Sequence, residues 1–443
     1  MPSSVLFDGS RYKTDLVVIG GGIVGVCVAL HAQGTGRQVT VVERRTPGWS
    51  ASGHNGGVLA VAEPMPVGEP AVVRRIPQML RDPLSPLAIR WSYLPRLAPW
   101  LVRFLLASRV RRVEAIGAAL HGLTAHVVDA YLPLLADCPE AARHVRDGGA
   151  LQVYGEDGAL AGAGLALQLR RRFGASFALL DDEGITAQDP FLAGRFRRAI
   201  HFPDWWSTTD PEALTLALAD RFRHRGGAML RAEVHRFVVR GGKVTGIETS
   251  SGGVEAGEIV IAAGAWSRRL VRQLGFDVPL DTERGYGVDL PAPGFTLRFP
   301  LVSGDHHFAM TPLRSGLRLA GTAELAGLAA PPNYARADTL VKAARLAFPE
   351  LRSEDARPWM AFRPSLPDSL PVIGRAPRHP GVYLAFGHGH KGLGQAAITG
   401  KLIQELLDGK EPTVDLAPFR PTRFMTARGL SSRLRARGAG RRS

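Results

Sequence analysis

Cysteine is scarce in this sequence. Cys27 and Cys138 are the two cysteines in 443 residues, and they lie far apart without a CxxC pair. This scarcity excludes a disulfide framework, a cysteine-held iron–sulfur cluster and a zinc-thiolate site. It fits a reducing compartment, so we expect a cytoplasmic protein.

Long apolar runs are also missing. The best candidate, LVVIGGGIVGVCVAL, has fifteen residues and is interrupted by glycines, which makes it a poor transmembrane helix. The opening residues, MPSSVLFDGSRYKTD, contain no basic region followed by an apolar stretch, so we expect no secretory signal.

Acidic residues are few relative to basic ones, and the net charge is +15. Residues 420–443 contain eight arginines and no acid. Because this segment has no sustained apolar period, we predict a disordered basic tail over 416–443. Such a tail is either simply solvated or attracted to anionic lipid or nucleic acid. We expect no specific nucleic acid partner.

A β-strand, a helix and a second strand are predicted near the N-terminus, in DLVVIGGGIVGVCVALHAQGTGRQVTVVER. Residues 16–19 and 39–42 are short apolar runs rich in β-branched residues, and a helical pattern continues to about Gln33. Glycines form G-x-G-x-x-G where the first strand meets the helix. This arrangement is typical of a βαβ unit that binds a dinucleotide.

Each part of this unit has a physical purpose. Gly20 permits the tight turn, Gly22 lets the backbone approach a pyrophosphate, and Gly25 lets helix and strand pack closely. The helix N-terminus offers unpaired N–H groups to the phosphates. Glu43, eighteen residues beyond Gly25, can accept both ribose hydrogen bonds and would repel a 2′-phosphate, so an NADP-type ligand is disfavoured. A purely structural glycine turn is the alternative.

A basic, aromatic-rich stretch follows a proline-punctuated segment. IRWSYLPRLAPWLVRFLLASRVRRVEAI mixes aromatic residues with arginines, and we predict a basic amphipathic helix over 90–113. Such a helix could lie on a membrane surface. The alternative is an ordinary helix that packs on a neighbouring domain with its arginines solvated.

The remaining sequence predicts an α/β protein with two domains. A helix begins at Thr209 or Asp210 with Pro211 in its first turn, and Gly241–Gly242 makes a hairpin turn. A buried strand over 259–262, a β-rich block after Pro279 and a helix over 395–407 follow. We assign a discontinuous, Rossmann-like dinucleotide-binding domain to 12–64, 203–279 and 357–415, and an α+β substrate domain to 65–202 and 280–356.

The stretch YLAFGHGHKGLGQAA, residues 383–397, admits three interpretations. Four glycines and two histidines lie between an apolar run and a helix. The residues alone fit a metal site, a phosphate loop or a wall against a flat cofactor. A metal site needs ligands beyond His388 and His390, and no third is evident nearby in the sequence, so we expect no metal.

Seven motifs occur in a fixed order along the chain. They are VIGGGIVG, ASGHNGG, IAAGAWS, PLDTERGYG, TPLRSGLRLAGTAE, FRPSLPDSLPVIG and FGHGHKGLG. In these motifs the chain resembles the FAD-dependent D-amino acid oxidase/dehydrogenase (DAO) superfamily, and most of all its bacterial D-amino acid dehydrogenases and hydroxyproline dehydrogenases. The resemblance extends from Asp15 to about Asp408. It implies a discontinuous FAD-binding domain with an inserted β-rich substrate domain.

The resemblance implies which residues hold FAD. The first glycine motif takes the ADP half, Val234 offers backbone atoms to adenine, and the loops at ASGHNGG and IAAGAWS run along the dinucleotide. The glycine loop and the start of the 395–407 helix approach the isoalloxazine, where the helix dipole would stabilise the reduced ring. The implied contacts are Gly20, Gly22, Ile23, Val24, Gly25, Glu43, Arg44, Ser52, Asn55, Gly56, Val234, Ala263, Gly264, Trp266, Gly389, Gly392, Leu393 and Gly394. No cysteine lies near these loops, so we expect noncovalent FAD; attachment through a histidine stays open.

The resemblance also implies residues for the reaction. Arg363 matches the arginine that pairs with the substrate carboxylate, which a planar guanidinium can bind through two hydrogen bonds. An arginine in a structural ion pair is the alternative. Tyr286 is either a second pocket residue or a core tyrosine. His388 is a local candidate for proton transfer, and Lys391 either assists the electron acceptor or is solvated.

The chain departs from the superfamily at two places. Close relatives often carry histidine where this chain has Gly287, and oxidase relatives carry a pocket tyrosine near the positions of Phe308 and Ala309. Both departures concern substrate specificity and leave the redox machinery intact.

The sequence thus predicts oxidative deamination of a D-amino acid or proline-like imino acid, with hydride transfer from the α-carbon to flavin N5. One alternative is an FAD amine oxidase acting on glycine, sarcosine or a γ-glutamylated polyamine. Another is a non-enzymatic FAD-containing assembly or RNA-binding protein, which only the arginine tail supports. The expected partners are a small amino acid, quinone or O2 as electron acceptor, and the anionic inner face of the cytoplasmic membrane.

Overall fold

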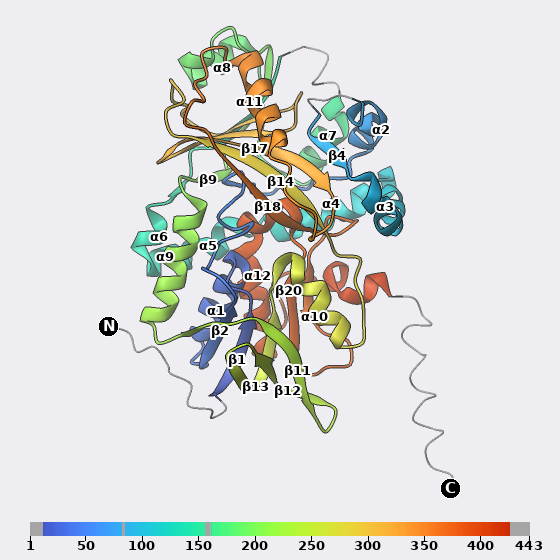
Figure 1. Cartoon of the computed structure of the whole chain (residues 1–443). Helices are drawn as coiled ribbons and strands as arrows, with labels where there is room; N and C mark the ends of the chain where they lie inside the picture. Colours follow the sequence, from blue (N-terminus) through green and yellow to red (C-terminus); the bar gives the residue numbers. More distant parts are fainter. Residues whose placement is uncertain (1–11, 82–84, 156–159, 161, 426–443) are drawn as a thin grey trace.

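Two large β-sheets, one above the other in Figure 1, form the frame of the molecule. A computed structural model describes residues 12–81, 85–155, 160 and 162–425. The lower sheet has a parallel centre in the order β10–β2–β1–β13, which β20 continues. Its strands are β1 (Tyr12–Ile19), β2 (Val39–Glu43), β10 (Ala228–Arg231), β11 (Val234–Arg240), β12 (Lys243–Thr249), β13 (Gly252–Ile261), β19 (Val372–Arg375) and β20 (Val382–Phe386).

The parallel centre follows from the residues of β1 and β2. Both strands are rich in β-branched residues and mostly buried, as expected for strands that are covered on both faces. They pair in parallel with Ile19 beside Val42. This register brings Gly20, which follows β1, next to Glu43, which ends β2.

Helices cover one face of this sheet. The face is covered by α1 (Ile23–Gln33), α12 (Gly392–Leu407), α9 (Pro211–His224), α4 (Val110–Thr124), α5 (Val127–Asp137) and α6 (Pro139–Ala142). The helices α1 and α12 pack closely, because a Cβ on Gly400 would lie 2.8 Å from the Cys27 backbone. The helix α10 (Ser267–Gln273) and the β11–β12 hairpin share the core on the other face.

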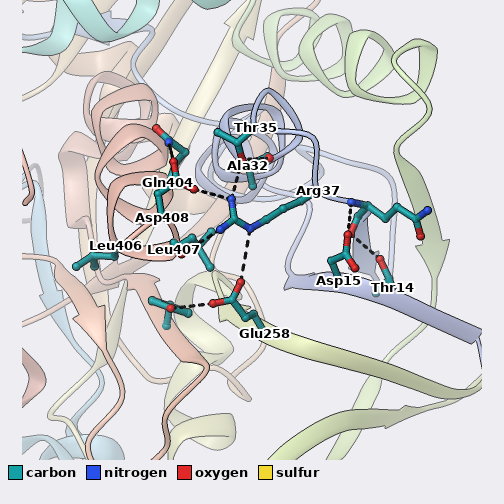
Figure 2. A network of polar contacts seen from close by, with 12 residues as sticks. Thr14, Asp15, Ala32, Thr35, Arg37, Glu258, Gln404, Leu406, Leu407 and Asp408 are labelled. Atoms are coloured by element: carbon teal, nitrogen blue, oxygen red, sulfur yellow. Dashed lines mark hydrogen bonds and ion pairs between the residues drawn. The ribbon is translucent and has the colours of Figure 1, made fainter. Parts of the chain in front are cut away.

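Arg37 fastens the C-terminal end of α12 to the parallel sheet (Figure 2). Its Nη1 donates to Asp408 Oδ1 at 2.7 Å, and its Nη2 donates to the Leu407 carbonyl at 3.0 Å. Its Nε lies 3.6 Å from Oε2 of Glu258 on β13. A cation at the last carbonyls of a helix is favoured by the helix dipole. The contact fixes the helix whose other end reaches the cavity described below.

The upper sheet is mostly antiparallel, in the order β18–β14–β17–β16–β15–β6–β8–β7, with β4 beside β17. Its outer face carries α8 (Asp182–Gln188) and α11 (Ala335–Ala347) around their own core (Figure 1). Its strands are β4 (Leu87–Ile89), β6 (Ala150–Tyr154), β7 (Ala178–Leu180), β8 (Arg198–Phe202), β14 (Asp281–Leu290), β15 (Leu301–Ser303), β16 (Ala309–Leu313), β17 (Gly316–Leu325) and β18 (Arg357–Ser365).

Smaller elements lie around the two sheets. A third sheet joins β3, β9 and β5, and the helices α2, α3 and α7 lie on the side drawn at the upper right of Figure 1. These elements are β3 (Val58–Leu59), β5 (Val145–Arg146), β9 (Trp206–Thr208), α2 (Pro70–Met79), α3 (Leu94–Ala107) and α7 (Gly164–Arg172). Within the described ranges, no helix is both long and apolar enough to cross a membrane.

Several local predictions are confirmed. The helix α9 begins at Pro211, and the Asp210 side chain caps it by accepting the N–H of Ala213 at 2.9 Å. Gly241 and Gly242 have φ of 56° and 78° in the turn that joins β11 to β12. The helix predicted from residue 395 begins three residues earlier, as α12.

The single helix predicted over 90–113 is wrong. The helix α3 ends at Ala107, Arg109 is extended, and α4 begins at Val110. The Ser108 hydroxyl donates to the Phe104 carbonyl at 2.8 Å and so satisfies a carbonyl in the last turn of α3. Such side-chain bonds to the backbone compete with continued helix.

The structure also differs from the predicted segment boundaries. The strand β18, assigned to the FAD-binding domain, pairs with β14 in the antiparallel sheet, and α4 and α5 share the core of α1 and α12. The predicted tail does not begin at 416, because Phe419 is fully buried and Arg423 pairs with Asp368 at 2.8 Å. Residues 417–419 and 421–424 form 3-10 turns, and residues 426–443 lie outside the described residues.

Candidate functional site

One cavity of about 680 Å³ runs between the two sheets. It begins at the carboxyl ends of β1 and β2, passes the start of α12 and ends at α2, β4 and α3. The carboxyl ends of parallel strands are the usual place for a ligand in such sheets. All the FAD contacts predicted from the sequence line this cavity except Gly25.

The glycines of the first motif are required by close backbone approach. Gly20 has φ of 115°, and a Cβ there would lie 2.4 Å from the Ala262 carbonyl oxygen. Gly25 lies behind the cavity wall, where a Cβ would meet the Gly20 oxygen at 1.9 Å. The Ile23 N–H donates to Ser52 Oγ at 2.9 Å, which ties the ASGHNGG loop to the start of α1.

Glu43 organises the end of the cavity nearest β2. Its Oε2 accepts the N–H of Gly21 at 2.7 Å, and its Oε1 accepts from Arg45 N at 3.0 Å and Trp49 Nε1 at 3.2 Å. The Arg44 guanidinium lies 4.0 Å from the centre of the Trp266 ring. Trp49 lines the same end and is a residue that the sequence analysis missed.

The ASGHNGG loop is shaped by its asparagine. Asn55 Nδ2 donates to the carbonyls of Ala51 and Ser52, and its Oδ1 accepts the N–H of Gly57 at 2.8 Å. The Gly56 carbonyl accepts from Thr311 Oγ1 at 2.6 Å, which ties the loop to β16. The loop therefore bridges the two sheets along the cavity. Val234, Ala263, Gly264 and Trp266 also line the cavity.

The glycine loop at the start of α12 forms another wall. Gly387 has φ of 86° and a Cβ there would lie 2.5 Å from Leu366 Cδ1, while Gly389 has φ of 54°. The Leu393 carbonyl accepts from Tyr131 Oη at 2.6 Å, which holds the first turn of α12 in place. Residues 387–395 all line the cavity, and α12 has no N-cap side-chain hydrogen bond. Its first N–H groups are thus left for a ligand.

His388 does not suit proton transfer. It is buried, and its Nε2 lies 2.9 Å from Thr399 Oγ1. Burial lowers the pKa of His388 to about 3, so the ring is neutral at physiological pH. It supports α12 from within, and we withdraw it as a candidate for the reaction.

Lys391 is not a solvated lysine. Its Nζ donates to the main-chain carbonyls of Met65 and, at 3.4 Å, Glu63, and the residue lines the cavity. Burial lowers the pKa of Lys391 to about 8. No local pattern predicts these contacts, because the carbonyl partners are more than three hundred residues away in the sequence.

Arg363 lies in the cavity wall on β18. Its Nη1 donates to the Thr322 carbonyl at 2.6 Å and its Nη2 to the Gly321 carbonyl at 2.9 Å. Each terminal nitrogen carries two hydrogens, so each retains one for a ligand. Among the described residues, no carboxylate forms an ion pair with Arg363 within 4 Å. Burial lowers the pKa of Arg363, and the charge of Glu283 opposes that shift.

Tyr286 does not line the cavity and belongs to the core. Its side chain is fully buried, and its hydroxyl donates to Glu324 Oε2 at 2.5 Å and accepts from Asn333 N at 2.9 Å. Successive side chains in a strand point to opposite faces. Since Glu283 on β14 lines the cavity, Tyr286 points away from it.

The two departures from the superfamily have structural counterparts. A Cβ on Gly287 would lie 2.1 Å from Cζ2 of Trp359, so the tryptophan occupies the space that a side chain there would need. Phe308 is buried and lines the cavity together with Ala309. Phe308 therefore gives the cavity aromatic surface, whereas Gly287 and Trp359 are not among the residues that line it.

The sequence analysis missed two further features of the cavity. Glu283 and His390 both line the cavity and are hydrogen-bonded to each other, with Oε2 and Nε2 2.7 Å apart. The far end is apolar and includes Ile76, Trp100 and Phe104. The spacing of Trp100 and Phe104, four residues apart in one helix, was the available signal for that face.

The cavity residues fit FAD. Main-chain N–H groups at the starts of α1 and α12 face the same space, and glycines line it where a Cβ would crowd a ligand. Glu43 uses three of the roughly four acceptor positions of a carboxylate, which leaves capacity for a ribose hydroxyl. Among the described residues, no group of three or more His, Cys, Asp or Glu could hold a metal ion.

Comparison with known proteins identifies the family. Residues 15–406 match the DAO family, described as FAD dependent oxidoreductase. The chain is 36% identical over 419 residues to a D-amino-acid oxidase of Bradyrhizobium diazoefficiens, covering 93% of this chain and 99% of the relative. It is 30% identical over 423 residues to a D-amino acid dehydrogenase of the same organism, covering 92% and 98%.

Solved structures share the fold. L-proline dehydrogenase from P. horikoshii matches with a TM-score of 0.69 at 20% identity, covering 94% of this chain and 98% of that chain. Glycine oxidase from Bacillus cereus ATCC 14579 matches with a TM-score of 0.66 at 20% identity, covering 90% and 96%. The match of residues 15–406 to the family and the 36% identity to a curated relative show that the chain belongs to the DAO family of FAD-dependent oxidoreductases.

Proposed function

We propose that this protein deaminates a D-amino acid, or a proline-like imino acid, by oxidising its Cα–N bond with bound FAD. One observation carries the proposal. Arg363 places a desolvated cation in the FAD-fitting cavity, and no described carboxylate pairs with it. The charge of Glu283 acts on Arg363, but that carboxylate is hydrogen-bonded to His390 and not to the guanidinium. The buried guanidinium therefore favours a ligand that brings a carboxylate.

The residues of the chain account for binding and orientation. Arg363 retains one hydrogen on each terminal nitrogen, which suits a carboxylate bound through two hydrogen bonds. The chain would hold FAD with Gly20, Gly22, Glu43 and the first turns of α1 and α12. Bound FAD supplies a two-electron acceptor for the α-hydrogen as hydride. Fixing the carboxylate helps to decide which enantiomer presents its α-hydrogen to that acceptor.

The choice of a D-amino acid rests on the named relatives. The curated relatives at 36% and 30% identity are a D-amino-acid oxidase and a D-amino acid dehydrogenase. The cavity supports a substrate with an apolar side chain, because its far end is formed by α2, β4 and α3 and includes Ile76, Leu101 and Phe104.

An anaerobic absorption spectrum of the FAD-loaded protein tests the proposal. We expect D-amino acids and D-proline to bleach the flavin, and L-amino acids and putrescine, which has no carboxylate, to leave it oxidised. Bleaching by putrescine would replace the proposal with an amine oxidase. Absence of a flavin spectrum after reconstitution with FAD would remove its basis.

We further propose that the protein docks on an anionic membrane surface through the segment 90–112. Five large apolar side chains here are 45–68% exposed: Trp91, Val102, Leu105, Leu106 and Val110. The segment contains six arginines and no acid, and none of these arginines has an ion pair with a described residue. Apolar side chains among arginines complement an anionic bilayer.

The position of α3, which lies within the segment 90–112, favours a membrane quinone as the electron acceptor. Trp100, Leu101 and Phe104 on the inner side of α3 line the cavity, while Val102 and Leu105 on its outer side are exposed. An apolar acceptor dissolved in the bilayer would therefore meet the cavity wall at α3. Turnover with a short-chain quinone under nitrogen, compared with O2 uptake, distinguishes the two acceptors.

Vesicle sedimentation tests the membrane proposal. We expect binding to vesicles containing phosphatidylglycerol at low salt, weak binding to phosphatidylcholine, and reduced binding for Leu105→Glu. The matched control is Leu346→Glu, which changes an exposed leucine of α11 in the same way. Binding by a chain that lacks residues 426–443 distinguishes the contribution of the segment 90–112 from that of the basic tail. Equal binding of both leucine variants would contradict the proposal.

A further inference from the structure

The pair Glu283–His390 is a polar feature of the cavity that substrate anchoring by Arg363 does not use. Glu283 Oε2 and His390 Nε2 are 2.7 Å apart, and both residues line the cavity. The glutamate is 7% exposed, whereas the histidine side chain is 37% exposed. The imidazole is therefore accessible from the cavity, and the carboxylate lies behind it.

The pair lies beside Arg363. Glu283 and Arg363 are Cα partners in the β14–β18 ladder, and both side chains point to the cavity face of the sheet. A Cβ on Gly285 would lie 2.3 Å from the guanidinium carbon of Arg363, so the guanidinium lies flat over this glycine of β14. An amino acid with its carboxylate on Arg363 thus presents its nitrogen close to Glu283 and His390.

The hydrogen bond of the pair fixes the role of each ring nitrogen. Burial opposes ionisation of Glu283, but the charge of His390 in its protonated form, the hydrogen bond from His390 and the charge of Arg363 lower its pKa. The hydrogen bond and Arg363 also favour the carboxylate when the imidazole is neutral. An ionised carboxylate only accepts hydrogen bonds, so the hydrogen on the shared bond belongs to Nε2 of His390. The other ring nitrogen, Nδ1, has no hydrogen bond recorded within the described part of the chain.

We propose that His390, held by Glu283, accepts the proton that the substrate ammonium must lose before oxidation. The inference rests on the proposed function. The N–H bond of the ammonium breaks, a bond from that hydrogen to His390 Nδ1 forms, and the nitrogen keeps the electron pair. When the α-hydrogen leaves as hydride to FAD, this pair forms the C=N bond of the imino acid. The imidazolium then releases its proton to water.

The charges around His390 are consistent with this role. Glu283 on β14 attracts both the ammonium and the imidazolium that forms, and Arg363 on β18 is engaged by the substrate carboxylate. Lys391 is the next residue along the chain, but its Nζ is directed to the carbonyls of Glu63 and Met65. His388 is neutral and faces Thr399. Glu283 acts through His390 and is a positioning residue.

The test measures anaerobic flavin bleaching by a D-amino acid that the wild type oxidises, across a range of pH. His390→Asn is expected to lower the rate constant at neutral pH by about 10²–10⁴-fold, the usual contribution of a positioned base. The defect should shrink at high pH, because the free substrate amine then arrives without its proton. Glu283→Gln should produce a smaller loss with the same pH trend.

Binding of benzoate, a carboxylate without an amine, provides a readout besides turnover. Its affinity, followed by the shift of the flavin spectrum, should change less than threefold in His390→Asn, because Arg363 is intact. His224→Asn, a change at an exposed histidine of α9, is the matched control and should bleach like the wild type.

The outcomes separate this inference from the proposed function. A wild type that no amino acid bleaches would refute the proposed function itself. A wild type that bleaches, with His390→Asn equally fast and with an unchanged pH profile, would overturn only the role of His390. A defect in His390→Asn that is constant across pH and accompanied by lost benzoate binding would show a structural role and would also overturn it.

Discussion

Two parts of the cavity are built in different ways. At the end near β2, Gly20, Gly21, Ile23, Glu43 and Ser52 come from one short stretch, and most of their contacts use main-chain atoms. In the part near the start of α12, Glu283, Arg363 and His390 come from separate segments, and their side chains form the polar surface of the cavity. We propose that the first part holds the cofactor and that the second binds the substrate.

This difference explains which part tolerates change. A backbone-lined site depends on the absence of side chains, so adding one methyl group obstructs it. A site lined by side chains from several strands can change one residue while the sheet remains. The predictions below test this contrast, beginning with the part that should be less tolerant.

The largest effect is expected for Gly25→Ala. The added Cβ would lie 1.9 Å from the Gly20 carbonyl oxygen, a main-chain atom that cannot move without displacing the cofactor loop. We expect the free energy of unfolding to fall by about 4 kcal/mol, and we expect little bound FAD. Thermal unfolding and the flavin-to-protein absorbance ratio check this. Gly164→Ala is the control, because a Cβ there meets nothing within 4 Å. Equal FAD content in both variants would contradict the prediction.

The second effect concerns Arg363→Leu. Losing charged hydrogen bonds to the substrate carboxylate should cost about 1.5–3 kcal/mol, which raises KM roughly tenfold to a hundredfold. FAD content should stay near that of the wild type, in contrast to Gly25→Ala. Arg357→Leu, on the exposed part of the same strand, is the control. Because Arg363 also binds two carbonyls, Arg363→Lys supplies a second variant that keeps the charge. An unchanged KM in both would remove Arg363 from the substrate site.

The same contrast explains what the sequence could predict. The βαβ unit, the Asp210 cap and the glycine turn depend on neighbours within a few residues, so local patterns contain the information. The inward position of Glu283 and the outward position of Tyr286 were also available from the alternation of a strand. Once Glu283 is placed on the cavity face beside Arg363, the alternation puts Tyr286, three residues later, on the opposite face of the sheet.

Other features depend on contacts that no local pattern contains. His390 meets Glu283 across 107 positions of sequence, and their pairing depends on how the two sheets come together. The inner face of α3 is another example, because Trp100 and Phe104 share a core cluster with Leu325, which lies on β17 far along the chain.

The third prediction concerns Lys391 and pH. Burial lowers the pKa of Lys391 from 10.5 to about 8 in the folded state. Between these values the unfolded chain binds more protons than the folded chain, so this group makes stability rise with pH. From about pH 7.5 to about pH 9.5, the wild type should gain about 2 kcal/mol relative to Lys391→Met. Urea unfolding of both proteins at each pH measures the difference, and a constant difference would show that the lysine is not desolvated.

The smallest effect is expected where the chain departs from its relatives, at Gly287. A Cβ there would lie 2.1 Å from Trp359, but the obstacle is a side chain, which can move at moderate cost. We expect Gly287→Ala to lower the free energy of unfolding by about 1 kcal/mol, the low end for overpacking. FAD content and the KM set by Arg363 should change little, because neither Gly287 nor Trp359 lines the cavity.

A double-mutant cycle with Trp359→Leu sharpens this last prediction. If the tryptophan is the obstacle, Gly287→Ala in the Trp359→Leu background should lower the free energy of unfolding by less than about 0.5 kcal/mol. The indole ring then no longer occupies the space that the added methyl group needs. Trp359 also donates to Asp289 Oδ1 at 3.1 Å, so Trp359→Leu has its own cost, which the cycle subtracts. An equal cost of Gly287→Ala in both backgrounds would mean that the backbone of β14, and not Trp359, resists the added methyl group. The sheet that holds Glu283 and Arg363 would then be as intolerant of an added methyl group as the glycine motif after β1, and the contrast between the two parts of the cavity would fail.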